Sequence, residues 1–369
     1  MSINPLQNIT IQLHEQKYNL DQFLNIKTFQ EDHILSSINF INDLLSDKPT
    51  IVQKTSGSTG APKAINIYKS QIEASAKSTL KTLSIHIGDN ALLCINPDFI
   101  GGKMMIARAL IGGLNLFIAP VKGNPLKDFN KDIKIDFFSF VPYQLDKIID
   151  ETAENIKFLD QSKAIILGGA PVSESLSEKI KNKFKNTNVY STYGMTETVS
   201  HVALKKINSF EKEVFQALEG VSFSTDEKSR LIIHAKNISG IDALKTNDVV
   251  KLHSTTSFEW LGRHDFVINS GGIKIHPEQL EQKILKIFSD YNISNNFFIY
   301  GKEDEMLGET VNLLLEGEID ITRIRLLLID NIEKYHQPKS IQSIPKFIET
   351  PSGKLNRNES IKLALDYNL

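Results

Sequence analysis

The order of apolar and helical segments between residues 69 and 191 constrains the fold more than any other feature of this sequence. Short apolar runs typical of buried strands occur at 91–95, 114–119, 136–141, 164–167 and 189–191, and segments of helical character lie at 69–83, 103–110, 143–150 and 173–184. Strands that alternate with helices predict a largely parallel sheet covered by helices on both faces. We therefore predict an α/β fold.

Two amphipathic stretches, at 21–29 and 34–45, precede this region. After it the pattern changes twice. Short alternating runs between 205 and 262 predict a small antiparallel β subdomain. Residues 266–369 read as a small α+β unit with helices at 278–288 and 322–332 and strands near 297–300 and 310–315. We predict a large N-terminal domain at 1–264 and a small, mobile C-terminal domain at 265–369.

Composition narrows the class of protein. The chain has 369 residues, of which 41% are hydrophobic and 23% are charged, as in soluble globular proteins. A net charge of −2 gives no basic surplus for nucleic acid, and the single cysteine, Cys94, excludes an intrachain disulfide and fits a reducing compartment. Lys103 and Arg108 interrupt the most apolar window, so we expect no membrane span. The N-terminus lacks the pattern of a signal peptide, and we predict a cytoplasmic protein of undetermined oligomeric state.

A loop rich in hydroxyls and glycines lies between two short apolar runs. It reads Thr55, Ser56, Gly57, Ser58, Thr59, Gly60, Ala61, Pro62, Lys63. Glycines let backbone N–H groups approach a ligand, hydroxyls donate to anionic oxygens, and the lysine adds a charge, which together suit a polyphosphate. It is not a Walker A loop, because Ala61-Pro62 separates the glycine from the lysine. The alternative is a solvated Ser/Thr/Gly linker. The apolar runs on either side, Ile51-Val52 and Ile65-Asn66-Ile67, count against it, because they predict a turn that joins two short strands.

Two further loops are predicted at strand ends, where α/β sheets bind ligands. Tyr193-Gly194-Met195-Thr196-Glu197-Thr198 offers an aromatic ring for a base, a hydroxyl for a phosphate and a carboxylate for a hard cation. The alternative is a polar loop with one packed tyrosine. Gly168-Gly169-Ala170-Pro171 ends the strand at 164–167, where small residues admit a flat ring, although an ordinary strand-to-helix turn explains it nearly as well.

Four later motifs are weak signals when each is taken alone. Asp248 lies in Thr-Asn-Asp, and Arg263 and Asp265 lie in Gly-Arg-His-Asp. The pair Gly271-Gly272 permits close backbone approach, and Lys354 lies in Pro-Ser-Gly-Lys-Leu-Asn-Arg near the end of the chain. Solvated charged residues and surface turns would account for each of them.

Taken in order, these motifs resemble the signatures of the acyl-adenylate-forming superfamily, which includes acyl-CoA synthetases, luciferases and adenylation domains. The resemblance implies that ATP, Mg²⁺ and coenzyme A bind here. The resemblance implies that the loop at 55–63 binds the ATP phosphates, that adenine lies against Gly169, Ala170, Tyr193 and Gly194, and that the ribose is bound by Asp248 and Arg263. It also implies that Thr196 contacts a phosphate or carboxylate, that Glu197 binds magnesium, and that Lys354 contacts the reacting carboxylate and the α-phosphate. Asp265 would be the hinge, and Gly271 and Gly272 would contact the pantetheine arm.

The chain departs from the family pattern in three places. Asn247 replaces the usual glycine, and asparagine tolerates the left-handed conformation better than most residues. Phe266 stands where a second aspartate is common. Only 54 residues precede the loop, so part of the usual N-terminal subdomain is expected to be missing or reduced.

A second resemblance concerns the acid substrate. Ser139-Phe140-Val141-Pro142-Tyr143-Gln144-Leu145 and the spacing from Gly102 to Arg108 are similar to those of o-succinylbenzoate–CoA ligases of menaquinone synthesis. Phe99 stands where related ligases carry a gating histidine. An arginine in the acyl pocket suits a dicarboxylic acid, because one carboxylate stays free while the other is activated. The alternative is that Arg108 snorkels from an apolar helix.

The predicted reaction has two steps. The acid and ATP form an acyl-adenylate and pyrophosphate, and coenzyme A then displaces AMP after the small domain rotates about Asp265. Two alternatives stay open at this point: an adenylation enzyme or another acyl-CoA synthetase that loads a different acid or a carrier protein, and a non-enzymatic nucleotide-binding relic.

Overall fold

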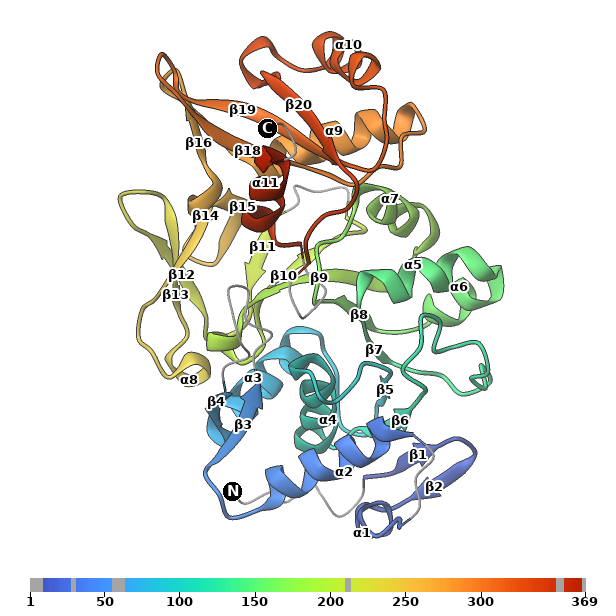
Figure 1. The fold of residues 1–369 in the computed structure, drawn as a ribbon. Coiled ribbons are helices and arrows are strands. Elements are labelled where there is room, and N and C mark those ends of the chain that lie inside the picture. Colours follow the sequence, from blue (N-terminus) through green and yellow to red (C-terminus); the bar gives the residue numbers. More distant parts are fainter. Residues whose placement is uncertain (1–8, 28–30, 55–63, 210–213, 350–354, 367–369) are drawn as a thin grey trace.

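The computed structural model describes residues 9–27, 31–54, 64–209, 214–349 and 355–366. Its centre is one 13-stranded sheet with the order β12-β13-β14-β15-β11-β10-β9-β8-β7-β5-β6-β1-β2 (Figure 1). The segment from β9 to β1 is parallel, and these strands are β9 (Asn188–Gly194), β8 (Ala164–Leu167), β7 (Phe137–Phe140), β5 (Asn90–Leu93), β6 (Asn115–Ile118) and β1 (Ile11–Leu13). The predicted α/β fold is confirmed.

Helices cover both faces of the parallel segment. Neighbouring residues of one strand enter different cores: Leu93 packs with one group of helices and Leu92 with the other, as expected for the two-residue period of a strand. One group is α2 (Asp32–Leu45), α3 (Lys69–Thr82) and α4 (Ile100–Gly112). The other is α5 (Pro142–Glu151), α6 (Ala153–Leu159) and α7 (Glu174–Lys183). Helix α6 was not predicted from the sequence.

The predicted antiparallel unit continues the same sheet. Strand β10 (His201–Lys206) pairs antiparallel with β9, and the series continues through β11 (Phe215–Ala217), β15 (Ser257–Arg263), β14 (Leu244–Ser254), β13 (Arg230–His234) and β12 (Ser222–Thr225). Helix α8 (Lys236–Ser239) connects β13 with β14. The antiparallel strands therefore continue the sheet sideways from β9, the outermost strand of the parallel segment on that side.

Two hairpins lie near the N-terminus. Strand β2 (Gln16–Tyr18) pairs with β1, and the short helix α1 (Leu20–Leu24) follows. Strands β3 (Thr50–Lys54) and β4 (Ala64–Tyr68) form a separate antiparallel pair, so the prediction that two short strands border the loop at 55–63 is confirmed. The loop itself lies outside the described residues.

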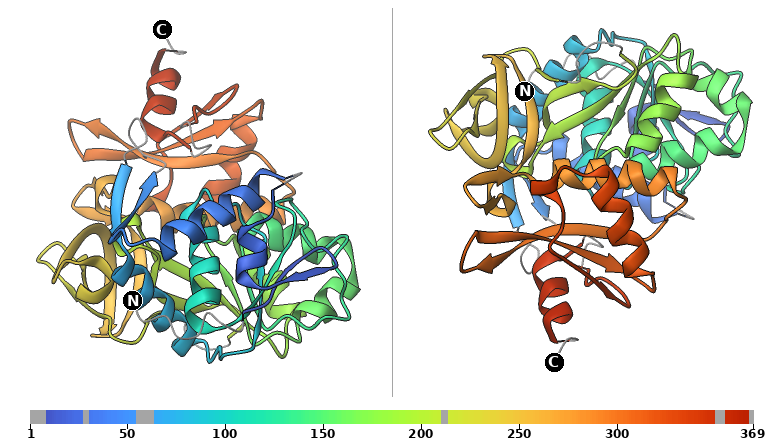
Figure 2. Two further views of the ribbon diagram at one scale, coloured as in Figure 1. Left: turned by 90° about the horizontal axis from the view of Figure 1, so that it is seen from below. Right: turned by 90° about the horizontal axis from the view of Figure 1, so that it is seen from above.

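A second sheet is built from the C-terminal part of the chain. It contains β16 (Ile268–Ser270), β17 (Ile273–Ile275), β18 (Phe297–Asp304), β19 (Gly308–Glu316) and β20 (Ser340–Ile344). Residues of α9 (Pro277–Asp290) and α10 (Ile321–Asn331) share a core with one face, and Ala364 of α11 (Arg357–Asp366) packs with the other. In both views of Figure 2 this sheet forms a layer to one side of the larger part.

Helix α9 packs against the end of β15 in the large sheet. The backbone N–H of Arg263 donates to Glu278 Oε1 at 3.2 Å, and a Cβ on Gly262 would lie 2.4 Å from Glu278 Oε2. Burial raises the pKa of this glutamate. The contact and the φ of +149° at Gly262 both favour glycine, because a Cβ there would be strained and would displace the Glu278 carboxylate.

Within the described part of the chain, we find no helix with the length and apolarity needed to cross a membrane.

Candidate functional site

Tyr193 and Asp248 meet at the junction between the parallel and antiparallel strands. Tyr193 is the next-to-last residue of β9, and its hydroxyl donates to Asp248 Oδ2 at 2.6 Å. Trp260 Nε1 on β15 donates to Oδ1 of the same carboxylate at 3.2 Å. Each carboxylate oxygen keeps a second lone pair, which could accept a ribose hydroxyl. Burial, with the negative charge of Asp248 beside it, raises the pKa of Tyr193, so the phenol keeps its proton.

The ring of Tyr193 is fixed by other aromatic side chains. Its centroid lies 5.1 Å from that of Phe258, in an edge-to-face arrangement, and 5.6 Å from that of Phe215. Tyr193 therefore lies within strand β9 and not in the loop that the sequence predicted. Its position in the strand directs the ring toward Phe215 and Phe258. Gly194 ends the strand, and a Cβ there would lie 2.3 Å from Ser200 O.

Arg263 lies directly opposite Asp248 on the paired strand β15. Its guanidinium contacts Asp265 Oδ2 at 2.7 Å, and both side chains are more than 40% exposed. Asn247 Nδ2 also donates to Asp265, at 3.4 Å. The interpretation of Asn247 as a residue that tolerates a left-handed backbone is wrong, because it lies within the extended strand β14 and has no positive φ.

The next predicted residues lie at the ends of β8 and β9. Gly169 and Ala170 are exposed just after β8, and Gly169 has a φ of +85°, which favours glycine. Thr196 and Glu197 belong to a 3₁₀ turn, η2 (Thr196–Thr198), and Glu197 is exposed. These strands are adjacent and parallel, so their carboxyl ends share one edge of the sheet.

A magnesium ion at Glu197 would need ligands from the nucleotide. Among the residues that the structure describes, no group of three or more His, Cys, Asp or Glu side chains could hold a metal ion. Magnesium is often bound by one or two carboxylates together with substrate phosphates, so a single exposed glutamate at a strand end fits this mode.

Other predicted residues fall outside the described part of the chain. These are Thr55, Ser56, Gly57, Ser58, Thr59, Gly60 and Lys63 of the loop, and Lys354. Arg357 of the Lys354 motif is described: it forms a double hydrogen bond with Glu281, at 2.8 Å for each contact.

Arg108 lies on helix α4, and its side chain is buried in the protein. It is 2% exposed, so the alternative that it snorkels to the surface is wrong. Its Nη2 donates to Ser200 Oγ at 2.9 Å, whereas its buried Nε has no partner, and no carboxylate of the described residues lies within ion-pair distance. Burial lowers the pKa of Arg108 to about 9, so the group remains charged at neutral pH.

The two residues predicted beside Arg108 differ in their environment. Gly102 is buried, and a Cβ on it would lie 2.6 Å from the backbone oxygens of Ile95 and Asn96. This packing alone accounts for a glycine. Phe99, the N-cap residue of α4, is 60% exposed.

The residues of the Val-Pro-x-Gln-Leu string have local structural roles. Pro142 occupies the first turn of α5, Gln144 Oε1 accepts from Val141 N at 3.1 Å, and Gln144 Nε2 donates to Cys94 O at 3.0 Å. Leu145 is fully buried. The string therefore begins helix α5 and fixes its end to the sheet.

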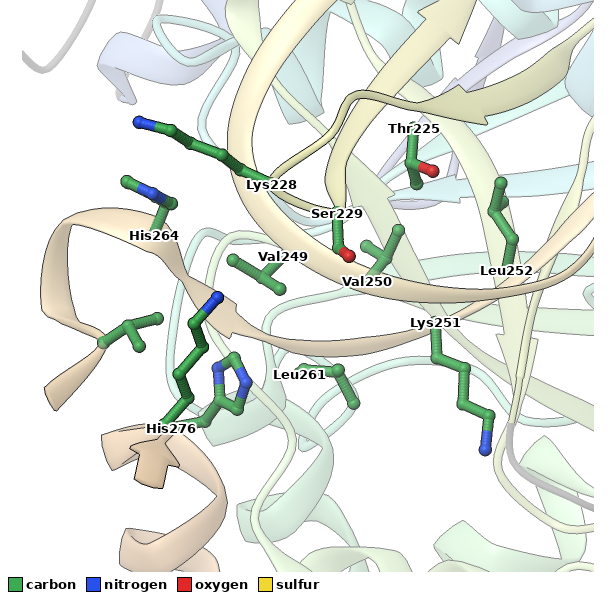
Figure 3. A pocket seen from close by; sticks show the side chains of 12 residues that line it. Thr225, Lys228, Ser229, Val249, Val250, Lys251, Leu252, Leu261, His264 and His276 are labelled. Atoms are coloured by element: carbon green, nitrogen blue, oxygen red, sulfur yellow. The ribbon is translucent and has the colours of Figure 1, made fainter. Parts of the chain in front are cut away.

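Gly271 and Gly272 form the exposed turn between β16 and β17, with φ values of +59° and +84°. Near this hairpin is a separate cavity of about 570 Å³, lined among others by Lys228, Lys251 and His276 (Figure 3). None of the predicted site residues that the structure describes lines it. The cavity is therefore distinct from the cluster around Tyr193 and Asp248.

Two residues of the site were missed in the sequence. Trp260 is the only tryptophan of the chain and lies three residues before Arg263, which was a usable signal. Ser200 follows the Tyr193 hexapeptide closely, but nothing in the sequence indicates that it contacts Arg108, which is 92 residues away.

Tyr193 and Glu197 lie at the carboxyl end of the parallel strand β9, and Asp248 of the antiparallel strand β14 is hydrogen-bonded to Tyr193, an arrangement that suits a nucleotide-binding α/β enzyme. The profile of the family described as "AMP-binding enzyme" matches residues 8–221. The chain belongs to this family, and it is an enzyme of the AMP-forming ligase class.

Named relatives and solved structures agree with this assignment. A 2-succinylbenzoate–CoA ligase of Lactococcus lactis is 25% identical over 335 residues, which cover 86% of this chain and 72% of the relative. A solved AMP-forming acyl-CoA synthetase-like protein from Dyadobacter fermentans is 33% identical, with a TM-score of 0.63 and coverage of 93% of this chain and 98% of that one. An O-succinylbenzoate coenzyme A synthetase from Bacillus subtilis, solved with ATP and magnesium ion, has the same fold, with a TM-score of 0.71 at 21% identity and coverage of 84% and 69%.

Proposed function

We propose that this enzyme is an acid–CoA ligase that activates a dicarboxylic aromatic acid, 2-succinylbenzoate, for menaquinone synthesis. The observation that carries the substrate class is Arg108: a buried guanidinium with an unpartnered Nε and no carboxylate among its described neighbours. A buried cation without a counter-ion is costly, and the distal carboxylate of such an acid would supply one. The name of the Lactococcus relative supports the particular acid.

In the proposed first step, Asp248 and Arg263 hold the ribose of ATP, with Asp248 oriented by Tyr193 and Trp260. Glu197 contributes a ligand to Mg²⁺, and Thr196 contacts the reacting phosphate or carboxylate. The loop at 55–63 holds the leaving phosphates, and Lys354 offsets the charge that develops between carboxylate and α-phosphate. The products are an acyl-adenylate and pyrophosphate.

In the proposed second step, residues 265–369 rotate as a domain about Asp265. This position lies in the 3₁₀ turn η3 (His264–Phe266), between the last strand of the large sheet and the first strand of the small one. The turn at Gly271 and Gly272 then approaches the pantetheine arm, and the thiol of coenzyme A displaces AMP. No acyl group is attached to the protein in either step.

The test is a panel of acids assayed by pyrophosphate release, with 2-succinylbenzoate and an analogue that lacks its distal carboxylate as the central pair. The proposal expects a strong preference for the dicarboxylate. Removal of one partner of a buried charge pair costs about 2–5 kcal/mol, so Arg108→Ala should raise KM for the dicarboxylate by roughly 30-fold or more and leave KM for ATP nearly unchanged.

A double-mutant cycle decides whether the contact is direct. If the loss from Arg108→Ala and the loss from the missing carboxylate simply add, Arg108 does not bind that carboxylate.

A second experiment supplies the acyl-adenylate and tests whether the acyl group is transferred to coenzyme A or to a carrier protein. Transfer to the carrier alone would contradict the proposed acceptor and favour an adenylation enzyme.

A further inference from the structure

A chain of hydrogen bonds, partly buried at Ser200 and fully buried beyond it, leads away from the guanidinium of Arg108. Its Nη2 lies 2.9 Å from Ser200 Oγ, and Ser200 Oγ lies 3.4 Å from His201 Nδ1. His201 Nε2 lies 3.1 Å from Thr79 Oγ1, which is 3.0 Å from the backbone oxygen of Ser75. The chain thus connects α4, the start of β10 and α3, and the side chains of His201 and Thr79 are buried.

The donors and acceptors in this chain have one consistent direction. Arg108 can only donate, so Ser200 accepts from it and its own proton is free to point to His201 Nδ1. At the other end, Thr79 donates to the carbonyl of Ser75, so its oxygen accepts from His201 Nε2–H. The histidine is then neutral and carries its proton on Nε2.

This direction is also the one that the charge of Arg108 favours. In this chain of hydrogen bonds, each donated hydrogen points away from the cation and each accepting lone pair points toward it. The successive bonds therefore polarise one another. A protonated His201 would turn an N–H toward Ser200 and bring a second positive charge near Arg108. Burial and the charge of Arg108 lower the pKa of His201, in agreement with the neutral form.

We propose that Ser200, His201 and Thr79 are positioning residues that set the orientation of Arg108 for the distal carboxylate of the acid. This inference rests on the proposed function, because it presumes that Arg108 binds that carboxylate. The network fixes Nη2 on Ser200 Oγ, and the buried Nε, which has no protein partner, is the donor that the carboxylate would satisfy. The selectivity of the acid site would then depend on residues that do not touch the acid.

The test measures kcat and KM of the full chain for the dicarboxylate, the monocarboxylic analogue and ATP. Ser200→Ala removes the acceptor of Arg108, and loss of a hydrogen bond to a charged group predicts a rise in KM for the dicarboxylate of about 10-fold or more. The KM for ATP and the kcat/KM for the monocarboxylic analogue should stay within about 2-fold. Ser200→Thr keeps the hydroxyl and should restore most of the preference.

Thr79→Val tests the far end of the network with little change of shape. It should lower the preference for the dicarboxylate by about 3-fold or more, since it removes the acceptor that fixes the imidazole. The matched control is Thr82→Val on the exposed side of the same helix, which should change nothing.

The outcomes separate this inference from the proposed function. If Arg108→Ala abolishes the preference for the dicarboxylate while Ser200→Ala and Thr79→Val leave it intact, the network is not a positioning device and the proposed function survives. If Ser200→Ala weakens both acids and ATP equally, the serine has only a structural role and the inference is also overturned. If Arg108→Ala itself leaves the preference unchanged, the proposed function fails first.

Discussion

Arg357 should be the strongest single attachment of the C-terminal tail to the small sheet. Its two terminal nitrogens each lie 2.8 Å from an oxygen of Glu281 on α9, and Nη1 also donates to Ile299 O at 3.1 Å. The guanidinium carbon lies 5.1 Å from the ring centroid of Phe266 and 5.3 Å from that of Phe298. The side chains of Arg357 and Glu281 are only 18% and 17% exposed.

The size of the effect follows from this burial. Arg357→Ala would leave the Glu281 carboxylate enclosed without its cation, and breaking a buried pair in this way costs about 3–5 kcal/mol. The two ring contacts contribute about 0.5–1 kcal/mol each at partly exposed sites. A domain is commonly stable by only about 5–15 kcal/mol, so we expect the variant to bring the small domain near its unfolding threshold.

The measurement is urea unfolding followed by circular dichroism for Arg357→Ala, Glu281→Ala and the double variant. The matched control is Lys362→Ala on the same helix, whose 2.7 Å contact with Glu359 is between exposed side chains. Exposed pairs are worth about 0–1 kcal/mol, so the control should hardly change the unfolding free energy.

The cycle is designed to refute the reasoning directly. We expect the double variant to be less destabilised than the sum of the two single variants, because neither charge is then left alone. Additive losses, or a loss for Arg357→Ala no larger than that of Lys362→Ala, would show that the pair does not attach the tail. Because Lys354 belongs to the same motif, Arg357→Ala should also slow adenylation more than thioester formation.

Three further predictions concern the proposed reaction and stability. Lys354→Ala should slow adenylation by about 100-fold or more and spare thioester formation from supplied acyl-adenylate, because a positioned cation is worth roughly 3 kcal/mol; equal losses in both half-reactions would contradict its role. Asp265→Pro fixes φ near −65° and should change the two half-reaction rates very differently, whereas equal effects would place the hinge elsewhere. His201 has a pKa lowered by burial and by Arg108, so below pH 6.5 the unfolded chain takes up a proton that the folded chain resists, and stability should fall by up to about 1.4 kcal/mol per pH unit. Urea unfolding at pH 7.5 and 5.5 should show a weaker pH dependence in His201→Gln, and identical dependence would contradict this.

The sequence predicted most elements of the fold because their signals are local. The two-residue period of the strands and the amphipathic pattern of α2 or α9 can be read from neighbouring residues alone. The structure therefore has these elements close to where they were expected. The hairpin of β1 and β2 and helix α6 were missed because they are only three to seven residues long, which leaves little periodicity to detect.

The arrangement of the site was harder to predict because its contacts are distant in the sequence. Tyr193 and Asp248 were named individually, but the hydrogen bond between them joins residues 55 positions apart. The same is true of Arg108: the sequence identified a charge in an apolar helix and left two explanations open. Only the packing of β10 and α3 against α4 reveals that the guanidinium is enclosed and bound to Ser200.

The structure also changes the weight of the signals for the acid substrate. The Val-Pro-x-Gln-Leu string begins α5, and its glutamine bonds to the backbone, so the string is explained without any ligand. Gly102 is likewise explained by its contact with the backbone at Ile95 and Asn96. Arg108 is different, because burying a cation is costly and its described neighbours supply the Ser200 hydroxyl but no carboxylate. The proposal of a dicarboxylic substrate therefore rests on this one side chain, and a ligase that gained its binding energy elsewhere would tolerate a neutral residue at position 108.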